Sequence, residues 1–287
     1  MTIRSGFIGL GNIGRPMAKR LAAAGLEPTV YDVVPARTAE LEAAGARGAA
    51  SPRAVAVASD VVGVCVRDDA DVRAVFEGDE GLLAGAGEGA VIAIHSTVQP
   101  ATVEALAAEA ARHGVSVVDA CITGGAAGAE QGTLTVMVGG DAAAIERARP
   151  FFDCFAKKTL RTGPLGSGCK MKLCNNLMTY LAWTSIYEAT QLARAAGLSQ
   201  EVLEEVTASN GNLTDPMRLF IVTHKLPDEV RQSEAFQQRM RGFVEIAEKD
   251  LAATLALARE CGITLPGTAT VSQIMARVYA LEDPKRR

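Results

Sequence analysis

The chain opens on Ile3-Arg-Ser-Gly-Phe-Ile-Gly9-Leu-Gly11-Asn-Ile-Gly14, an apolar run that ends in three spaced glycines. The run predicts a strand over residues 3–10, and apolar residues with helical spacing follow it. A strand, a glycine turn and a helix in this order are typical of a dinucleotide site. Gly9 would permit the tight turn, Gly11 the approach of a pyrophosphate, and Gly14 close packing of helix on strand. The candidate cofactor contacts in this turn are Gly9, Gly11, Asn12, Ile13 and Gly14.

Asp32 directly follows the second predicted strand, residues 28–31, and lies 18 residues beyond Gly14, where a ribose-binding carboxylate is expected. A carboxylate there accepts hydrogen bonds from both ribose hydroxyls and repels the extra phosphate of NADP. We therefore expect NAD as the cofactor. Arg37 lies close enough in sequence to pair with that phosphate, so NADP stays possible. In the alternative interpretation, Asp32 only caps the turn that follows it.

Strands and helices continue to alternate as far as residue 163. The pattern predicts helices over 38–44, 52–58, 72–76 and 101–113, and strands over 61–66, 90–94, 115–118 and 135–138. Such alternation predicts a doubly wound parallel sheet with its ligand at the carboxyl ends of the strands. Two predicted loops fall at those ends, residues 95–97 and residues 119–125.

The second of these loops continues through residues 123–134, which hold four glycines and little side-chain bulk. Successive glycines expose backbone N–H groups, and together with the Thr123 hydroxyl these groups could bind a carboxylate. Thr123, Gly124 and Gly125 are therefore candidate substrate contacts. The alternative is an ordinary glycine-rich connection.

After residue 163 the chain changes character. One long apolar helix is predicted over 170–196, followed by helices over 200–209, 234–261 and 268–279, with no strand-like alternation. We therefore expect an α/β dinucleotide-binding (Rossmann) domain over 1–163 and an all-α domain over 164–287. The long interdomain helix should line the cleft between them. Residues 210–234 either cover this cleft, with Arg218 or His224 near substrate, or form interface surface, which we favour.

The long helix begins with Gly166-Ser-Gly-Cys-Lys-Met-Lys-Leu-Cys-Asn-Asn176, which places polar side chains in an apolar setting. Lys172 and Asn176 are four residues apart, so they project from one face of the helix. An amine and an amide facing one cleft suit proton transfer. The alternative is a solvated lysine with a capping asparagine, although two adjacent asparagines inside a helix are costly without a reason.

The composition indicates a globular protein, with 48% hydrophobic and 22% charged residues and a net charge of −4. The balance of charges gives no reason to expect nucleic acid, and no apolar run suggests a membrane segment or leader. We therefore expect a cytoplasmic protein. The six cysteines lack metal-ligand spacing, so we expect no metal and reduced, mostly buried thiols. The apolar long helix favours a homodimer or homotetramer formed through the helical domain.

Four motifs together resemble the β-hydroxyacid dehydrogenases, a group that includes 3-hydroxyisobutyrate dehydrogenase, tartronate semialdehyde reductase and relatives of 6-phosphogluconate dehydrogenase. They are Gly6-Phe-Ile-Gly-Leu-Gly-Asn-Ile-Gly-Arg-Pro-Met-Ala18, Asp119-Ala-Cys-Ile-Thr-Gly-Gly125, the Gly166–Asn176 stretch and Lys249-Asp250-Leu251. The resemblance implies that Lys172 relays the hydroxyl proton and that Asn176 holds the reacting oxygen. It further implies substrate contacts at Thr123, Gly124, Gly125 and Asn175, and cofactor contacts at Ser96, Thr97 and Lys249.

The chain departs from the family pattern at two positions. His95 precedes the Ser96-Thr97 pair where aspartate is usual, and Arg67 replaces a proline. Thr123 stands where the family usually has serine, which keeps the hydroxyl. The two departures put cofactor preference and pH dependence in question, while every catalytic group is kept. The chain is also too short for the large 6-phosphogluconate dehydrogenases.

The expected activity is hydride transfer between a nicotinamide cofactor and a small 3-hydroxyacid that binds through its carboxylate. A lysine must be neutral to accept a proton, and its unperturbed pKa is about 10.4, so oxidation should be favoured at alkaline pH. One alternative is an NADPH-dependent aldehyde, semialdehyde or imine reductase, although imine-reducing relatives usually lack the lysine. Another is a non-catalytic dinucleotide-binding protein.

Overall fold

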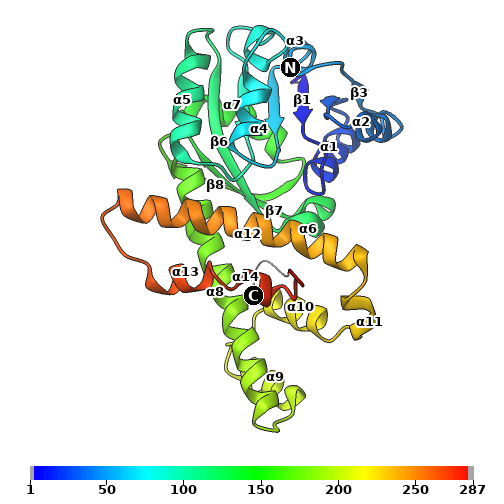
Figure 1. Cartoon of the computed structure of the whole chain (residues 1–287). Coiled ribbons are helices and arrows are strands. Elements are labelled where there is room, and N and C mark those ends of the chain that lie inside the picture. The colour runs from blue at the N-terminus through cyan, green and yellow to red at the C-terminus, as the bar shows by residue number, and fades with distance from the viewer. Residues whose placement is uncertain (1–2, 284–287) are drawn as a thin grey trace. The chain divides into compact units, whose positions relative to one another are not determined.

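The computed structural model describes residues 3–283 and divides into two compact units, one ending at Lys172 and the other beginning at Leu173. The first unit holds a β-sheet with flanking helices, and the described part of the second holds helices without strands (Figure 1). The division falls inside helix α8 (Ser167–Ala195), whereas we predicted a boundary after residue 163, where the last strand ends.

Eight strands form one sheet in the order β3-β2-β1-β4-β5-β6-β7-β8. They are β1 (Ser5–Ile8), β2 (Thr29–Tyr31), β3 (Arg47–Gly48), β4 (Val61–Val64), β5 (Val91–Ile94), β6 (Ser116–Thr123), β7 (Leu134–Gly139) and β8 (Ala156–Gly163). The first six are parallel, and β1 pairs with β2 on one side and β4 on the other. The chain therefore reverses its course across the sheet at β1, as in a doubly wound fold. The predicted fold class is confirmed.

Apolar cores cover the two faces of the sheet. Strands β1, β4 and β5 are buried along their whole length, and successive residues face opposite sides, so Phe7 joins one core and Ile8 the other. One core is completed by α1 (Gly14–Ala23), α2 (Pro35–Glu42), α6 (Gly125–Gln131) and α7 (Ala142–Phe152). The other is completed by α3 (Pro52–Val57), α4 (Asp69–Phe76), the short turn η1 (Leu82–Ala84) and α5 (Pro100–Ala111).

The structure corrects the prediction along the last three strands. Strand β6 continues through residues 119–123, which we predicted as a loop, and β7 pairs with it antiparallel. Helix α6 occupies most of the predicted glycine loop. Strand β8 escaped prediction because its residues are exposed or half-buried and carry charges, as suits a sheet edge, so it lacks an apolar signal.

The second unit contains the rest of α8 and six further helices. They are α9 (Gln200–Ser209), α10 (Asp215–His224), α11 (Asp228–Arg231), α12 (Glu234–Glu260), α13 (Pro266–Val271) and α14 (Met275–Val278). Hydroxyl side chains cap the first three long ones: Ser199 starts α9, Thr214 starts α10 and Ser233 starts α12, each accepting an N–H from the first turn. One apolar core joins α8, α10, α12 and α14.

Residues 210–234, which the sequence left open, form α10 and α11. His224 at the end of α10 is half-buried, and its ring packs against Phe220 and Tyr187. Its Nε2 bonds the carbonyl oxygen of Val278 at 2.7 Å. His224 is thus held within the helical unit by its own packing.

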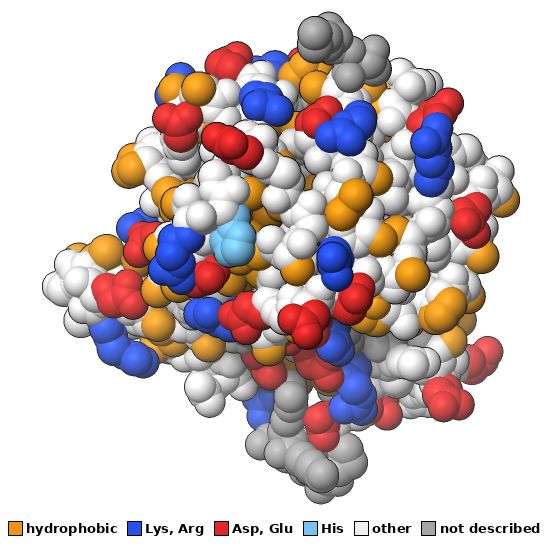
Figure 2. Space-filling view, turned by 90° about the horizontal axis from the view of Figure 1, so that it is seen from above, with side chains coloured by type: hydrophobic (Ala, Val, Ile, Leu, Met, Phe, Trp, Pro, Cys, Tyr) orange, Lys and Arg blue, Asp and Glu red, His pale blue; other side chains and the backbone are white. Residues whose placement is uncertain are grey.

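Charged side chains are mixed on the molecular surface. On the face that Figure 2 shows, basic and acidic side chains are interspersed without an extended patch of one sign. Charged side chains of the first unit form ion pairs, such as Arg4 with Asp60 at 2.7 Å and Lys19 with Glu40 at 2.8 Å. No helix in the described part of the chain is both long and apolar enough to cross a membrane.

Candidate functional site

The turn between β1 and α1 has the geometry that a dinucleotide needs. A Cβ on Gly9 would lie 2.2 Å from the Cys65 carbonyl oxygen, and one on Gly14 would lie 1.9 Å from the Gly9 carbonyl oxygen. Larger residues are therefore excluded at both positions, and Gly9 also has a φ of +89°. A Cβ on Gly11 would meet nothing within 4 Å, so open space lies beside that backbone. These residues fit a bound pyrophosphate, with Asn12 and Ile13 in the same turn.

Asp32 joins the ends of β1 and β2. Its buried carboxylate accepts the Leu10 N–H at 2.7 Å and the Val34 N–H at 2.8 Å. Arg37 donates to both carboxylate oxygens, at 3.3 and 3.4 Å. The structure thus brings Asp32 to the glycine turn, and the bond to Val34 shows that it also caps the turn after β2.

Ser96 and Thr97 follow β5 at the carboxyl edge of the sheet. The Ser96 hydroxyl donates to the Val66 carbonyl oxygen at 2.8 Å and accepts the Val66 N–H at 2.9 Å. This pair of bonds fixes the chain that leaves β4. Ser96 therefore shapes the sheet edge through the backbone, and Thr97 comes directly after it.

Thr123 and the two glycines lie where β6 passes into α6. Thr123 is the last residue of β6 and pairs with Thr135 of β7. Gly124 and Gly125 have φ values of +123° and +64°, a backbone that residues with a side chain rarely adopt. The chain reverses there and opens the first turn of α6, whose N–H groups have no intrahelical acceptor.

Asp119, a motif residue to which we gave no role, anchors the start of α8. Its side chain is fully buried in β6, where its two oxygens accept the Gly166 N–H at 2.9 Å and the Cys169 N–H at 2.8 Å. Burial raises the pKa of this carboxyl, and the backbone N–H groups partly offset that rise. A Cβ on Gly168 would lie 2.5 Å from the Asp119 carbonyl oxygen, so β6 and α8 touch closely.

The cysteines are only partly as predicted. All six are free thiols, but only Cys121 and Cys169 are buried, while Cys174 and Cys261 are exposed. The sulfur atoms of Cys121 and Cys169 lie 3.6 Å apart. The Cys121 contact and burial raise the pKa of the Cys169 thiol, so it stays protonated.

Lys172 and Asn176 both lie on α8, four residues apart and half-buried. Side chains at this spacing leave one face of a helix. Asn175 donates to the Asn176 side-chain oxygen at 3.3 Å, and the Asn176 amide donates in turn to Asp250 at 2.7 Å. The amide orientation of Asn176 is thereby fixed, because a carboxylate only accepts.

Asp250 is the residue of this site that the sequence analysis missed. It is 1% exposed and accepts hydrogen bonds from Asn176, from the Tyr180 hydroxyl at 3.0 Å and from Lys249 at 2.9 Å. We named Asp250 only as a member of the Lys249-Asp250-Leu251 motif and gave it no role. The signal was present, because Asp250 shares the i, i+3, i+4 spacing of the buried Ala247 and Thr254.

His95 lies in the aromatic core of the first unit. Its ring stacks on Phe7 and Phe151, with centroids 5.9 and 6.2 Å away, and its Nδ1 bonds the Ala120 carbonyl oxygen at 2.7 Å. Burial lowers the pKa of His95 to about 4, against 6.5 for the free side chain. A histidine at position 95, where the family usually has aspartate, therefore affects the packing of the core and the stability of the protein in acid.

We expect His95 to make the protein less stable in acid. Between pH 6.5 and about 4, His95 binds a proton in the unfolded chain but not in the folded protein. The free energy of unfolding therefore falls as the pH is lowered. Between pH 7 and pH 5 this should cost about 2 kcal/mol. Urea unfolding at both pH values should show a smaller loss for His95→Phe, which keeps the ring stacking. The exposed His113→Phe serves as control, and an equal loss in all three proteins would contradict the assignment.

No group of three or more His, Cys, Asp or Glu side chains within residues 3–283 is arranged to hold a metal ion.

Known proteins match the chain over nearly its whole length. Residues 4–163 match the NAD binding domain of 6-phosphogluconate dehydrogenase, and residues 166–286 match the NAD-binding domain of NADP-dependent 3-hydroxyisobutyrate dehydrogenase. The NAD-dependent L-serine dehydrogenase of Pseudomonas aeruginosa is 34% identical over 96% of this chain and 90% of its own. The 2-(hydroxymethyl)glutarate dehydrogenase of Eubacterium barkeri is 32% identical over 95% of this chain and 88% of its own.

A solved structure, Mycobacterium tuberculosis 3-hydroxyisobutyrate dehydrogenase with L-serine, matches with a TM-score of 0.82 and 29% identity. The match covers 98% of this chain and 94% of that one. Domain models, sequence relatives and fold agree with the motifs around the glycine turn and α8. The chain belongs to the β-hydroxyacid dehydrogenase family.

Proposed function

We propose that the protein oxidises a small 3-hydroxyacid to the matching semialdehyde, and catalyses the reverse reduction, with NAD favoured over NADP. The observation that carries the proposal is the hydrogen bond of 2.7 Å from the Asn176 amide to the buried Asp250. It fixes an amide one helical turn from Lys172, and the second N–H of that amide remains to hold a substrate oxygen. An oriented donor beside an amine is what a hydroxyl-to-carbonyl conversion requires.

Each group of residues has one role in this proposal. Lys172 accepts the hydroxyl proton in oxidation and returns it in reduction, while Asn176 holds the reacting oxygen. Backbone N–H groups at Gly124 and Gly125, with the Thr123 hydroxyl and Asn175, bind the substrate. The glycine turn holds the pyrophosphate, Asp32 the ribose hydroxyls, and Ser96, Thr97 and Lys249 the nicotinamide end. The bound nicotinamide supplies the hydride acceptor or donor.

The relatives narrow the class of substrate. L-serine, 2-(hydroxymethyl)glutarate and 3-hydroxyisobutyrate, named for three of them, each carry a primary hydroxyl on the carbon next to the one that bears the carboxylate. Such a molecule offers a carboxylate to the proposed turn at Gly124 and Gly125 and a hydroxyl to Lys172. We therefore propose a primary 3-hydroxyacid as substrate.

Absorbance of the reduced nicotinamide tests the proposal. The protein should reduce NAD at alkaline pH with at least one of these three hydroxyacids, and should oxidise NADH with the matching semialdehyde. Acids without the 3-hydroxyl serve as the negative control. No turnover with any hydroxyacid, despite measurable NAD binding, would contradict the proposed substrate class.

Asp32→Asn should weaken the preference for NAD. The change removes the charge and keeps an acceptor for only one of the Leu10 and Val34 N–H groups, so we expect a KM for NAD about tenfold higher with little change in kcat. Initial rates with NAD and NADP give the comparison. Arg37→Gln is the matched control: it should leave NAD kinetics nearly unchanged and weaken any use of NADP. An unaltered NAD to NADP ratio in Asp32→Asn would refute this role.

We also propose that the helical unit joins a second copy of the chain. Helix α9 has no buried residue, and Val202 and Val206 on one of its faces are 57% and 54% exposed. Leu192 and Val222 on neighbouring elements are exposed as well. Sedimentation should show a dimer or tetramer, and Val202→Glu with Val206→Glu should shift it toward monomer. A wild-type monomer at micromolar concentration would contradict this.

The cytoplasmic location stays a prediction.

A further inference from the structure

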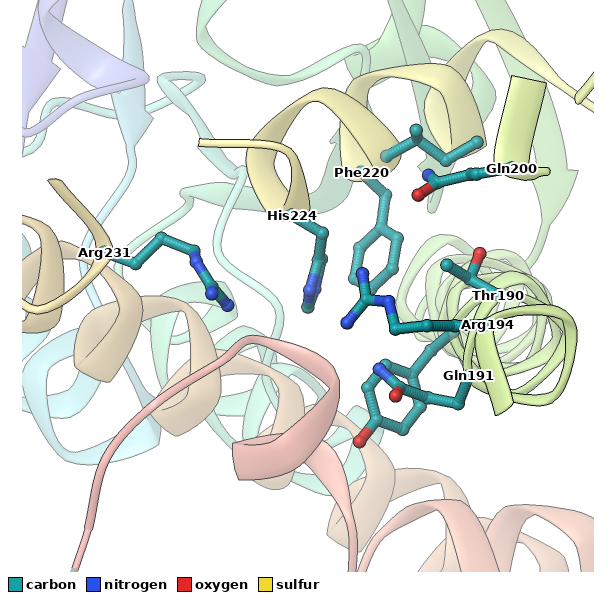
Figure 3. Close-up of a pocket in the computed structure, with 9 residues that line it drawn as sticks. Thr190, Gln191, Arg194, Gln200, Phe220, His224 and Arg231 are labelled. Carbon is teal, nitrogen blue, oxygen red and sulfur yellow. The ribbon is translucent and has the colours of Figure 1, made fainter. Parts of the chain in front are cut away.

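A small pocket in the helical unit carries charge that the proposed reaction does not use. It lies between the second half of α8, the start of α9, α10 and α11, and its polar lining comes from Thr190, Gln191, Arg194, Gln200, His224 and Arg231. Figure 3 shows Arg194 and Arg231 reaching toward His224 from opposite sides. None of the lining residues is an aspartate or a glutamate.

The two guanidinium groups are poorly neutralised. Arg231 pairs at its outer edge with Asp228, but its buried Nε–H finds no acceptor among residues 3–283. Arg194 forms no ion pair with any carboxylate in the described part of the chain. Two cations that face one cavity repel each other unless an anion lies between them.

The positive charges of Arg194 and Arg231 also act on the ring of His224. Its Nε2 donates to the Val278 carbonyl oxygen, so in the neutral ring the proton is on that nitrogen. Burial and the neighbouring Arg231 and Arg194 lower the pKa of His224. The ring therefore stays neutral and leaves the two arginines as the charges of the pocket.

The size and chemistry of the cavity limit the ligand. Its volume of about 30 Å³ admits a group of a few atoms and excludes a nucleotide. Guanidinium groups match the planar or tetrahedral arrangement of oxygens in carboxylates and phosphates, and the Gln191 and Gln200 amides and the Thr190 hydroxyl can add neutral donors.

We propose that this pocket is a binding site for a small oxyanion, held between Arg194 and Arg231. The site belongs to the helical unit alone and does not depend on the proposed reaction. Inorganic phosphate and the carboxylate of a small metabolite both offer negatively charged oxygens to the guanidinium groups. The experiment below distinguishes these two ligands.

Calorimetric titration of the full chain tests the site, with potassium phosphate in one arm, sodium acetate in the other, and ionic strength held constant with chloride. We expect saturable binding of one anion per chain in at least one arm. Binding of phosphate alone identifies phosphate as the source, and binding of acetate identifies a carboxylate. Arg194→Gln should raise the dissociation constant about tenfold or more, because a charged donor is lost.

Arg231→Gln gives an independent test from the other side of the pocket and should weaken the binding of the same anion. The matched control is Arg259→Gln, an exposed arginine near the end of α12 that does not line the pocket, and it should bind as wild type does. Far-UV circular dichroism checks that every variant is folded. No saturable binding in either arm, or equal affinity in Arg194→Gln and Arg259→Gln, would overturn the proposal.

Discussion

Replacing Lys172 by alanine is expected to lower turnover by about two orders of magnitude or more while NAD still binds. The amine is the one group proposed to take the hydroxyl proton, and alanine leaves that proton without an acceptor. Alanine also suits a helix interior, so α8 should form as before. Steady-state rates and the quenching of protein fluorescence by NAD measure the two expected results.

Lys170→Ala is the matched control for this experiment. Lys170 lies two residues earlier, on another face of the same turn of α8, and is exposed, so its loss removes the same charge nearby. We expect near wild-type turnover from it. Turnover close to wild type in Lys172→Ala would end the assignment of Lys172, whereas equal losses in both variants would indicate an effect of net charge.

Asp119→Ala is expected to destabilise the protein by about 3 kcal/mol, because two buried N–H groups lose their only charged acceptor. The start of α8 should shift with that loss and displace Lys172. A displacement of about 1 Å can lower a rate by about a hundredfold, so kcat should fall more than KM changes. Urea unfolding and steady-state kinetics measure the two effects.

Asp141→Ala is the control because Asp141 also accepts two backbone N–H groups, from Ala143 and Ala144 at the start of α7, but is exposed. Water can replace its oxygens, so we expect a loss of only about 1 kcal/mol and unchanged kinetics. If Asp119→Ala cost no more than Asp141→Ala, the buried cap would not be what positions α8.

The parts of the fold that follow from local patterns were predictable. The glycine turn, the buried strands and the long helix each have a spacing that depends only on nearby residues. Strand β8 lacks such a signal, because a polar edge strand is stabilised by pairing with its neighbour. Strand β7 was predicted, but its antiparallel direction depends on its pairing with β6. The continuation of β6 past Asp119 was hidden for a similar reason, since a buried carboxylate resembles a loop residue until its N–H partners are known.

In the candidate site, too, the features that follow from local sequence were predictable, and those that depend on distant residues were not. Asp32 beside the glycine turn was predictable, because the strand spacing of a doubly wound fold places it there. Helical spacing indicated that Asp250 faces the core, but its hydrogen bonds to Asn176 and Tyr180 could not be predicted, because these partners are distant in sequence. His95 was noticed only as a departure, and its neutral state follows from aromatic packing that no local pattern shows.

Transfer of deuterium tests the central claim most directly. The protein would be incubated with NAD and 3-hydroxyisobutyrate in which both hydrogens of the hydroxyl-bearing carbon are deuterium, and the reduced cofactor analysed by NMR. Hydride transfer predicts one deuterium at C4 of the nicotinamide and slower turnover than with the unlabelled acid, and L-serine labelled at the same position is the second substrate to try. Reduced cofactor without deuterium, or no reduction with any labelled 3-hydroxyacid, would contradict the account.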